Sequence, residues 1–168
     1  MTLLDAPVFD ANRDRRRRII SYSAVGLVFV LLVAFWLVSG RPIDWPWNWY
    51  HYFAARSTVN SFLTSVEKDD LVKAYAIWIH DKNWQQHPSQ TGPYPFSRFQ
   101  DDWSPTSPNN EYGDIKSHKI ALAGRYGNGI LVAILINGRK SGALNLDYDP
   151  ATDTLSFAPP GVALYLGP

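Results

Sequence analysis

The segment Ile19–Val38 most constrains how this chain folds, because its twenty residues contain no Asp, Glu, Lys, Arg or His. Thirteen of them are Leu, Ile, Val or Phe. Twenty residues at the rise of an α-helix extend about 30 Å, which is the thickness of the hydrocarbon core of a bilayer. Inserting the thirteen apolar side chains contributes on the order of −4 to −8 kcal/mol. The segment therefore predicts a transmembrane helix.

A cleaved signal peptide is the alternative for this segment. The small residues in "VSG", residues 38–40, are compatible with a cleavage site. The apolar region of a signal peptide usually has about 7–15 residues, however, and this one is longer. The length therefore favours an uncleaved anchor.

Basic residues in front of the apolar segment predict its orientation. Flanks rich in arginine stay in the cytoplasm, and only Arg41 follows the segment closely. We therefore expect residues 1–18 to form a cytoplasmic tail and residues 41–168 to lie on the other side. In a bacterial cell this is a single-pass protein of the inner membrane with a periplasmic domain. The arginines that set the topology are Arg13, Arg15, Arg16, Arg17 and Arg18, and binding of anionic lipid or of a partner is their alternative role.

An aromatic stretch, "RPIDWPWNWYHYF", follows the apolar segment. Trp and Tyr favour the headgroup zone of a membrane, where the ring body and its polar N–H or O–H are both accommodated. We therefore read residues 39–51 as an interfacial linker, and the alternating tryptophans predict an extended strip with one face on the membrane. For Tyr52 and Phe53 we favour packing in the core. The predicted interface residues are Trp45, Trp47, Trp49 and Tyr50.

The charge of the remaining chain argues against nucleic acid as a partner. Residues 41–168 carry eleven basic and twelve acidic side chains, so they lack the basic footprint that nucleic-acid binding requires. The chain has no cysteine, which excludes disulfides and thiolate chemistry. We predict no metal site and no cofactor.

Helices are expected in the first part of the outer domain, residues 52–168. Asp69 is the predicted N-cap of a helix over residues 70–79, and Ser97 is the predicted cap of a short helix over residues 98–103. Residues 80–95 read as a loop. An earlier helix is predicted by apolar residues at spacings of three and four, namely Tyr52, Ala55, Val59, Phe62 or Leu63, and Val66.

Strands follow after Gly113. Residues 114–126 and "ILVAILI" flank a Gly-Asn-Gly turn, and Asn137-Gly138 is a strong hairpin signal before "KSGALNLDY". The final strand is "TLSFAPP". We expect an α+β fold, in which an N-terminal transmembrane helix precedes two to three helices packed on a curved four-stranded antiparallel sheet.

The stretches "FLTSVEKDDLVKAYAIW", "SRFQDDW" and "YGDIKSHKI" resemble nuclear transport factor 2-like domains, a superfamily of cystatin-like α+β cones with membrane-anchored bacterial members. The resemblance covers about residues 52–158. It implies a pocket between helices and sheet, and self-association through the sheet. The candidate pocket residues are Tyr75, Trp78, Phe99, Trp103, His118 and Tyr148.

His118 is the weak candidate for catalysis, because a histidine beside a carboxylate in an apolar pocket can transfer protons. It lies near two lysines in "KSHKI", so a surface or strand-edge histidine is the default interpretation. We expect a non-catalytic domain that binds a small apolar ligand or a membrane-protein partner at the bilayer. The alternatives are a tethered isomerase- or hydrolase-type enzyme and an accessory subunit of a larger membrane complex.

Overall fold

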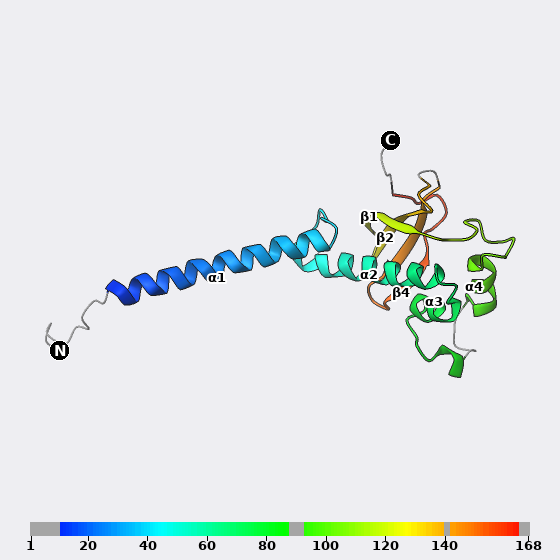
Figure 1. Cartoon of the computed structure of the whole chain (residues 1–168), viewed down its shortest axis with the longest axis horizontal. Coiled ribbons are helices and arrows are strands. Elements are labelled where there is room, and N and C mark those ends of the chain that lie inside the picture. Colours follow the sequence, from blue (N-terminus) through cyan, green and yellow to red (C-terminus); the bar gives the residue numbers. More distant parts are fainter. Residues whose placement is uncertain (1–10, 88–92, 140–141, 165–168) are drawn as a thin grey trace. The chain divides into compact units, whose positions relative to one another are not determined.

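The computed structural model describes residues 11–87, 93–139 and 142–164, and it forms two compact units, Met1–Val38 and Ser39–Pro168. The first unit holds α1, Ala11–Val38 (Figure 1). This helix buries none of its side chains, and Val25 and Phe29 are 69% and 66% exposed. Among the described residues, α1 is the one helix that is long and apolar enough to cross a membrane. The predicted apolar helix is confirmed, and its crossing of a membrane stays a prediction.

The helix α1 begins eight residues before the apolar segment. Its first two turns carry the arginines that we expect to set the topology, so this part of the predicted tail is helical. Residues 1–10 of the predicted tail lie outside the described residues.

The second unit contains three α-helices, two 3₁₀ helices and four strands in its described part. The strands form an antiparallel meander in the order β1-β2-β3-β4 (Figure 1). The elements are η2 Pro46–Asn48, α2 Trp49–Val66, α3 Leu71–Trp78, η3 Trp84–Gln86, α4 Phe96–Trp103, β1 His118–Tyr126, β2 Gly129–Ile136, β3 Leu144–Asp149 and β4 Thr154–Phe157. The predicted α+β class is therefore confirmed.

Turn chemistry fixes the hairpins where the sequence places them. Asn137 and Gly138 both have positive φ, 51° and 70°, which the two central residues of a type I′ turn require. The side chain of Asn137 also accepts hydrogen bonds from the backbone N–H groups of Lys116 and Ser117 at 2.8 and 3.1 Å. It thereby holds the chain that enters β1, and β1 begins only at His118. Lys140 and Ser141 of the predicted third strand lie outside the described residues.

The helices cover one face of the sheet. The α2 helix contacts β1 and β2, and α3 contacts β4 (Figure 1). The predicted apolar stripe of α2 is buried throughout its length, which confirms it. On β3, Leu144, Leu146 and Tyr148 are buried and alternate with half-buried residues, as the sequence pattern predicts.

Aromatic rings fill the space between the helices and the sheet. Phe62 lies at the centre, with its ring centroid 4.9 Å from that of Trp103, 5.3 Å from Trp78 and 6.1 Å from Phe99. The five bulkiest fully buried side chains of the unit are Trp103, Tyr75, Tyr148, Phe62 and Phe99. The interior of this domain is therefore packed with rings.

The outer face of the sheet is covered in part by the C-terminal segment. Leu131 and Ala133 on this face are 1% and 0% exposed. The backbone N–H of Leu164 donates to Asn145 Oδ1 at 3.4 Å, and a Cβ at Gly124 would lie 3.0 Å from Leu164 Cδ2. A partner that binds at the centre of this face must first displace the chain's own segment.

Two predicted helix caps are wrong. The cap of α3 is Asp70, whose Oδ1 accepts a hydrogen bond from the backbone N–H of Lys73 at 3.1 Å. Asp69 instead has a left-handed φ of 56° and completes the turn between α2 and α3. The α4 helix begins at Phe96 after Pro95, and Ser97 lies within its first turn. Pro95 occupies the N-cap position with a φ of −72°, a value that its ring fixes.

Paired variants distinguish the two aspartates. We expect Asp70→Ala to lower the free energy of unfolding by about 1 kcal/mol through loss of the cap. Asp69→Gly should leave it unchanged or raise it by about 0.5–1 kcal/mol, because glycine adopts positive φ without strain. Denaturant unfolding of the full chain in detergent measures both values, and the reverse order would contradict this assignment of the cap.

Candidate functional site

The second unit opens with a turn that Asp44 organises. Its Oδ1 accepts hydrogen bonds from the backbone N–H of Trp45 at 2.7 Å and from Asn48 Nδ2 at 3.0 Å. Its Oδ2 accepts a hydrogen bond from the Tyr52 hydroxyl at 3.4 Å and lies 3.8 Å from Arg125 Nη1. Since Tyr52 is buried in the core, these contacts fasten the turn to the domain.

The turn presents apolar side chains to solvent. Trp45 and Trp47 are 66% and 70% exposed, and their rings stack with centroids 5.0 Å apart and planes 5° apart. Ile43 is fully exposed, and Tyr50 is 63% exposed. We call Ile43, Trp45, Trp47 and Tyr50 the aromatic turn. Its position in the chain is just after α1.

The extended strip predicted for the tryptophans is wrong. Pro46–Asn48 form a 3₁₀ helix and Trp49 begins α2, so the alternation in sequence does not become alternation in space. Trp49 is half-buried, and its Nε1 donates to the backbone carbonyl of Asp44 at 2.8 Å. The cause is local, since Asp44 engages the backbone and Asn48 side chain of the following turn while Pro46 supplies helical φ at its first position.

Hydrogen bonds hold the pKa of Asp44 below its ordinary value. The largest contribution comes from Asn48, with further contributions from the Trp45 backbone, the Arg125 charge and Tyr52, while burial opposes them. The pKa of Tyr52 is raised, first by burial and then by the Asp44 charge beside it. The charged carboxylate is thus the form that the turn stabilises.

This shift predicts an acid-sensitive contribution to stability. A carboxyl with a lowered folded pKa stabilises the fold above its unfolded pKa, near 4, and loses that contribution as the pH falls through the lower folded value. We therefore expect Asp44→Asn to be less stable than the parent chain at pH 7 and equally stable near pH 2. Urea unfolding at several pH values tests this. A difference that does not depend on pH would contradict a role for the charge.

His118 joins the sheet to α2. Its Nδ1 lies 2.6 Å from Glu67 Oε1, and its Nε2 lies 3.1 Å from Asn60 Oδ1. His118 begins β1, which is an edge strand of the sheet, and its side chain is only 8% exposed, so it is a strand-edge histidine and not a solvent-facing one. The packing of α2 on β1 brings residues 51 and 58 positions away in sequence to the first residue of the strand.

Both ring nitrogens of His118 are already engaged in this arrangement. Proton transfer to a substrate needs one nitrogen that faces it. His118, Tyr75, Phe99 and Tyr148 also line none of the four grooves that stand out on this unit, which measure about 400 to 720 Å³. His118 is thus placed to hold α2 against β1 through its mostly buried contacts with Glu67 and Asn60.

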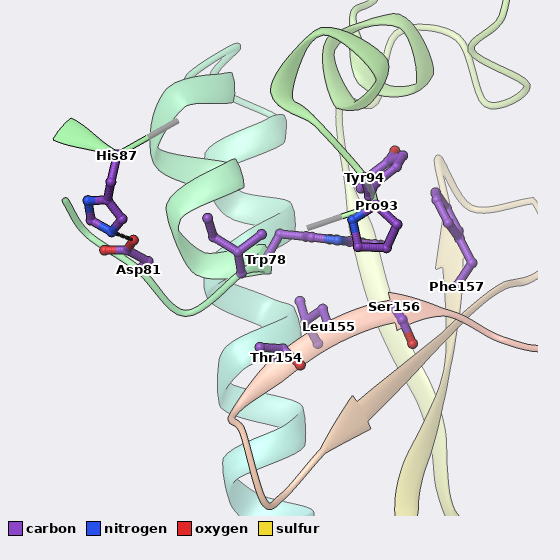
Figure 2. A pocket seen from close by; sticks show the side chains of 10 residues that line it. Trp78, Asp81, His87, Pro93, Tyr94, Thr154, Leu155, Ser156 and Phe157 are labelled. Carbon is purple, nitrogen blue, oxygen red and sulfur yellow. Dashed lines mark ion pairs between the residues drawn. The ribbon is translucent and has the colours of Figure 1, made fainter. Parts of the chain in front are cut away.

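Of the predicted pocket residues, Trp78 and Trp103 reach grooves. Trp78 lies at the floor of a groove of about 680 Å³ between α3, the following loop and the edge strand β4 (Figure 2). The rings of Tyr94 and Phe157 form one end of it, and the Asp81–His87 pair, at 2.7 Å, lies at the other (Figure 2). Trp103 lines a smaller groove of about 400 Å³ with Phe157.

Tyrosine hydroxyls in this interior are held by internal partners. The Tyr75 hydroxyl donates to the Tyr94 carbonyl at 2.7 Å, and the Tyr94 hydroxyl donates to Asp102 Oδ2 at 2.8 Å. Burial, followed by Asp102, strongly raises the pKa of Tyr94, so it stays protonated. The Tyr148 hydroxyl donates to Asp153. Within the described residues, no group of three or more His, Asp or Glu side chains is arranged to hold a metal ion.

The contact between His118 and Glu67 makes a testable contribution to stability. His118→Ala leaves the Glu67 carboxylate without its hydrogen-bond partner, and we expect it to cost about 1.5–3 kcal/mol. The control is His87→Ala, since the Asp81–His87 pair is 31–38% exposed and should contribute less than about 1 kcal/mol. Unfolding in guanidinium chloride measures both, and equal losses would contradict the role of His118 in holding α2 against β1.

Sequence reasoning missed Asp44, Asn60 and Glu67. Aspartate often hydrogen-bonds the backbone of a turn, and proline favours turns, so "DWPWN" carries a turn signal for Asp44. Nothing in the local sequence couples Asn60 or Glu67 to His118, because the contact is made only by tertiary packing.

The sequence was compared with protein-family models, curated proteins and solved structures, and none of them matches it.

Proposed function

We propose that this chain is a single-pass membrane protein whose outer domain is a non-catalytic binding or interaction module held against the membrane surface. The observation that carries the proposal is the aromatic turn. Two stacked indoles, a fully exposed isoleucine and an exposed tyrosine form an apolar surface in the eight residues Ile43–Tyr50. An exposed apolar surface of this kind is typical of a membrane or protein contact.

The distance along the chain favours the membrane as that contact. Ile43 follows the last residue of α1 by five positions, so the chain between them reaches at most about 18 Å. If α1 spans the bilayer, the aromatic turn has to lie within or near the headgroup layer. Trp and Tyr are the side chains that this layer accommodates best.

The rigid attachment of the turn would then orient the whole domain. Asp44 ties the turn to Tyr52, and Trp49 starts α2 and donates back to the Asp44 carbonyl. A turn immersed in the headgroups would therefore hold the domain close to the bilayer instead of letting it roam. This supports a partner that is itself a membrane protein, or an apolar ligand taken from the membrane surface. The side of the membrane, with the domain outside the cytoplasm, follows from the arginines before the apolar segment.

The relation to nuclear transport factor 2-like domains remains part of this proposal. The order of the elements, with helices first and then an antiparallel meander, supports it. Self-association through the sheet is a weaker part, because Leu164 already lies on the outer face.

The second candidate function is a tethered acid–base enzyme. The short contact between His118 and Glu67 favours it, since it supplies the carboxylate that such a histidine needs. We rank the enzyme second because the Nε2 of His118 already contacts Asn60 and because His118 lines none of the four grooves. An accessory subunit of a larger complex is compatible with the leading proposal.

Single-cysteine labelling tests the membrane contact, because the chain has no other cysteine. We expect a nitroxide at Tyr50→Cys, in the full chain in lipid nanodiscs, to be accessible to oxygen and shielded from a water-soluble nickel complex. The control is Val72→Cys, which is 44% exposed at the start of α3. Val72 does not belong to the aromatic turn, so the control label should contact water. Equal nickel accessibility at both sites would contradict the proposal.

A further inference from the structure

A cavity of about 490 Å³ lies beside the aromatic turn, within the second unit. One wall consists of residues 40–44, which follow α1 directly, and the other consists of residues 122–125 of β1. Ile43 and Leu122 give it apolar surface, while Arg41 and Arg125 give it cationic side chains.

A third guanidinium lies against the same wall. Gly40 lines the cavity, and a Cβ at this position would lie 2.9 Å from Arg56 Nη1. Gly40 has a φ of 91°, and Arg41 also has a positive φ of 57°. Glycine thus lets the Arg56 guanidinium approach the backbone closely, and the turn brings arginines from three different elements to one place.

Positive charge exceeds negative charge around this cavity. Its one lining carboxylate, Asp44, already accepts hydrogen bonds from three neutral donors, and its distance to Arg125 is 3.8 Å. Arg56 is half-buried, and within the part of the chain that the structure describes it forms no hydrogen bond or ion pair. Burial of this group, which disfavours the cation, lowers its pKa. A half-buried guanidinium keeps five N–H donors that an anion can satisfy.

The position along the chain limits which anions reach this site. Gly40 follows Val38 by two residues, so it lies at most about 7 Å from the end of α1. Each headgroup layer of a bilayer is about 5–8 Å thick. If α1 is the anchor, the cavity opens among lipid phosphates.

We infer that this cavity binds the phosphate of an anionic phospholipid, with Arg41, Arg56 and Arg125 as the residues that contact it. The planar guanidinium matches the geometry of phosphate oxygens and donates two parallel hydrogen bonds to them. Ile43 and Leu122 supply an apolar wall for the glycerol and the first part of the acyl chains. This inference rests on the proposed function, since it requires α1 in the bilayer, and it adds the chemistry of the lipid.

Native mass spectrometry of the full chain in detergent, with phosphatidylglycerol or phosphatidylcholine added, tests the site. Both lipids carry a phosphate, but choline cancels its charge. We expect the parent chain to retain one phosphatidylglycerol in preference to phosphatidylcholine. Each arginine near such a surface is worth about fivefold in affinity, so Arg56→Gln with Arg125→Gln should lower phosphatidylglycerol binding about 25-fold.

A matched control removes the same charge at the other end of α1. Arg16→Gln with Arg17→Gln should keep the strong phosphatidylglycerol binding, because these residues lie in the first turns of the helix. Equal losses in the two double variants would overturn the inference, since they would reduce it to attraction by net charge. Strong competition by free glycerol phosphate would also overturn it, by indicating a soluble phosphate instead of a lipid.

A second pair of substitutions tests whether the loss of binding comes from misfolding. Arg41 and Arg125 both have exposed side chains, and Arg41→Gln with Arg125→Gln leaves the half-buried Arg56 in place. This variant should keep the circular dichroism spectrum of the parent and still lose most of its phosphatidylglycerol preference. Unchanged lipid preference in this folded variant would overturn the inference. Failure of the proposed function is distinguishable, because it would place the Tyr50 label in water, whereas failure of the lipid site alone would leave that label immersed.

Discussion

The packing of aromatic rings between the helices and the sheet is the constraint on which the rest of this domain depends. Phe62 brings α2, α3 and α4 together through its contacts with Trp78, Phe99 and Trp103. Ring pairs in edge-to-face geometry add roughly 0.5–1.5 kcal/mol each beyond the area they bury. The same packing fills the space that a ligand would occupy between the layers. Sites for partners therefore have to be sought in the surface grooves and on the turn that follows α1.

Asp44 is the residue that links the aromatic turn to the core. Its two carboxylate oxygens connect the aromatic turn to Tyr52 and approach Arg125 on β1. The proposed membrane contact and the inferred phosphate site share this wall, since Ile43 belongs to both. In this arrangement, the exposed rings would set the depth of the domain in the headgroup layer, and the arginines would select the charge of the lipid.

Local patterns predicted those parts of the fold that neighbouring residues decide. The apolar periodicity of α2 predicts its buried stripe, and the turn preference of Asn137-Gly138 predicts the hairpin. Both signals are local and favour one conformation strongly. Caps were harder, because Asp69 and Asp70 are chemically the same and only the backbone tells them apart: one adopts φ 56° and the other caps α3. The tryptophans of the aromatic turn were predicted as an extended strip for a similar reason. Tryptophans at every second position are typical of an extended strand. Pro46 and the hydrogen bonds of Asp44 instead favour the 3₁₀ helix Pro46–Asn48.

The sequence by itself determined that α1 is an apolar helix of membrane-spanning length, that the remainder is α+β, and that aromatic residues gather just after the helix. These features follow from composition and short-range periodicity, so they can be predicted without knowing any tertiary contact. Only the tertiary structure decided which rings face outward and that His118 contacts Glu67 across 51 residues. It also decided that Arg56 lies against Gly40, beside a cavity that Arg41 and Arg125 line. Such meetings depend on how α2 lies on β1, and pairings between distant residues leave no trace in the local pattern of either one.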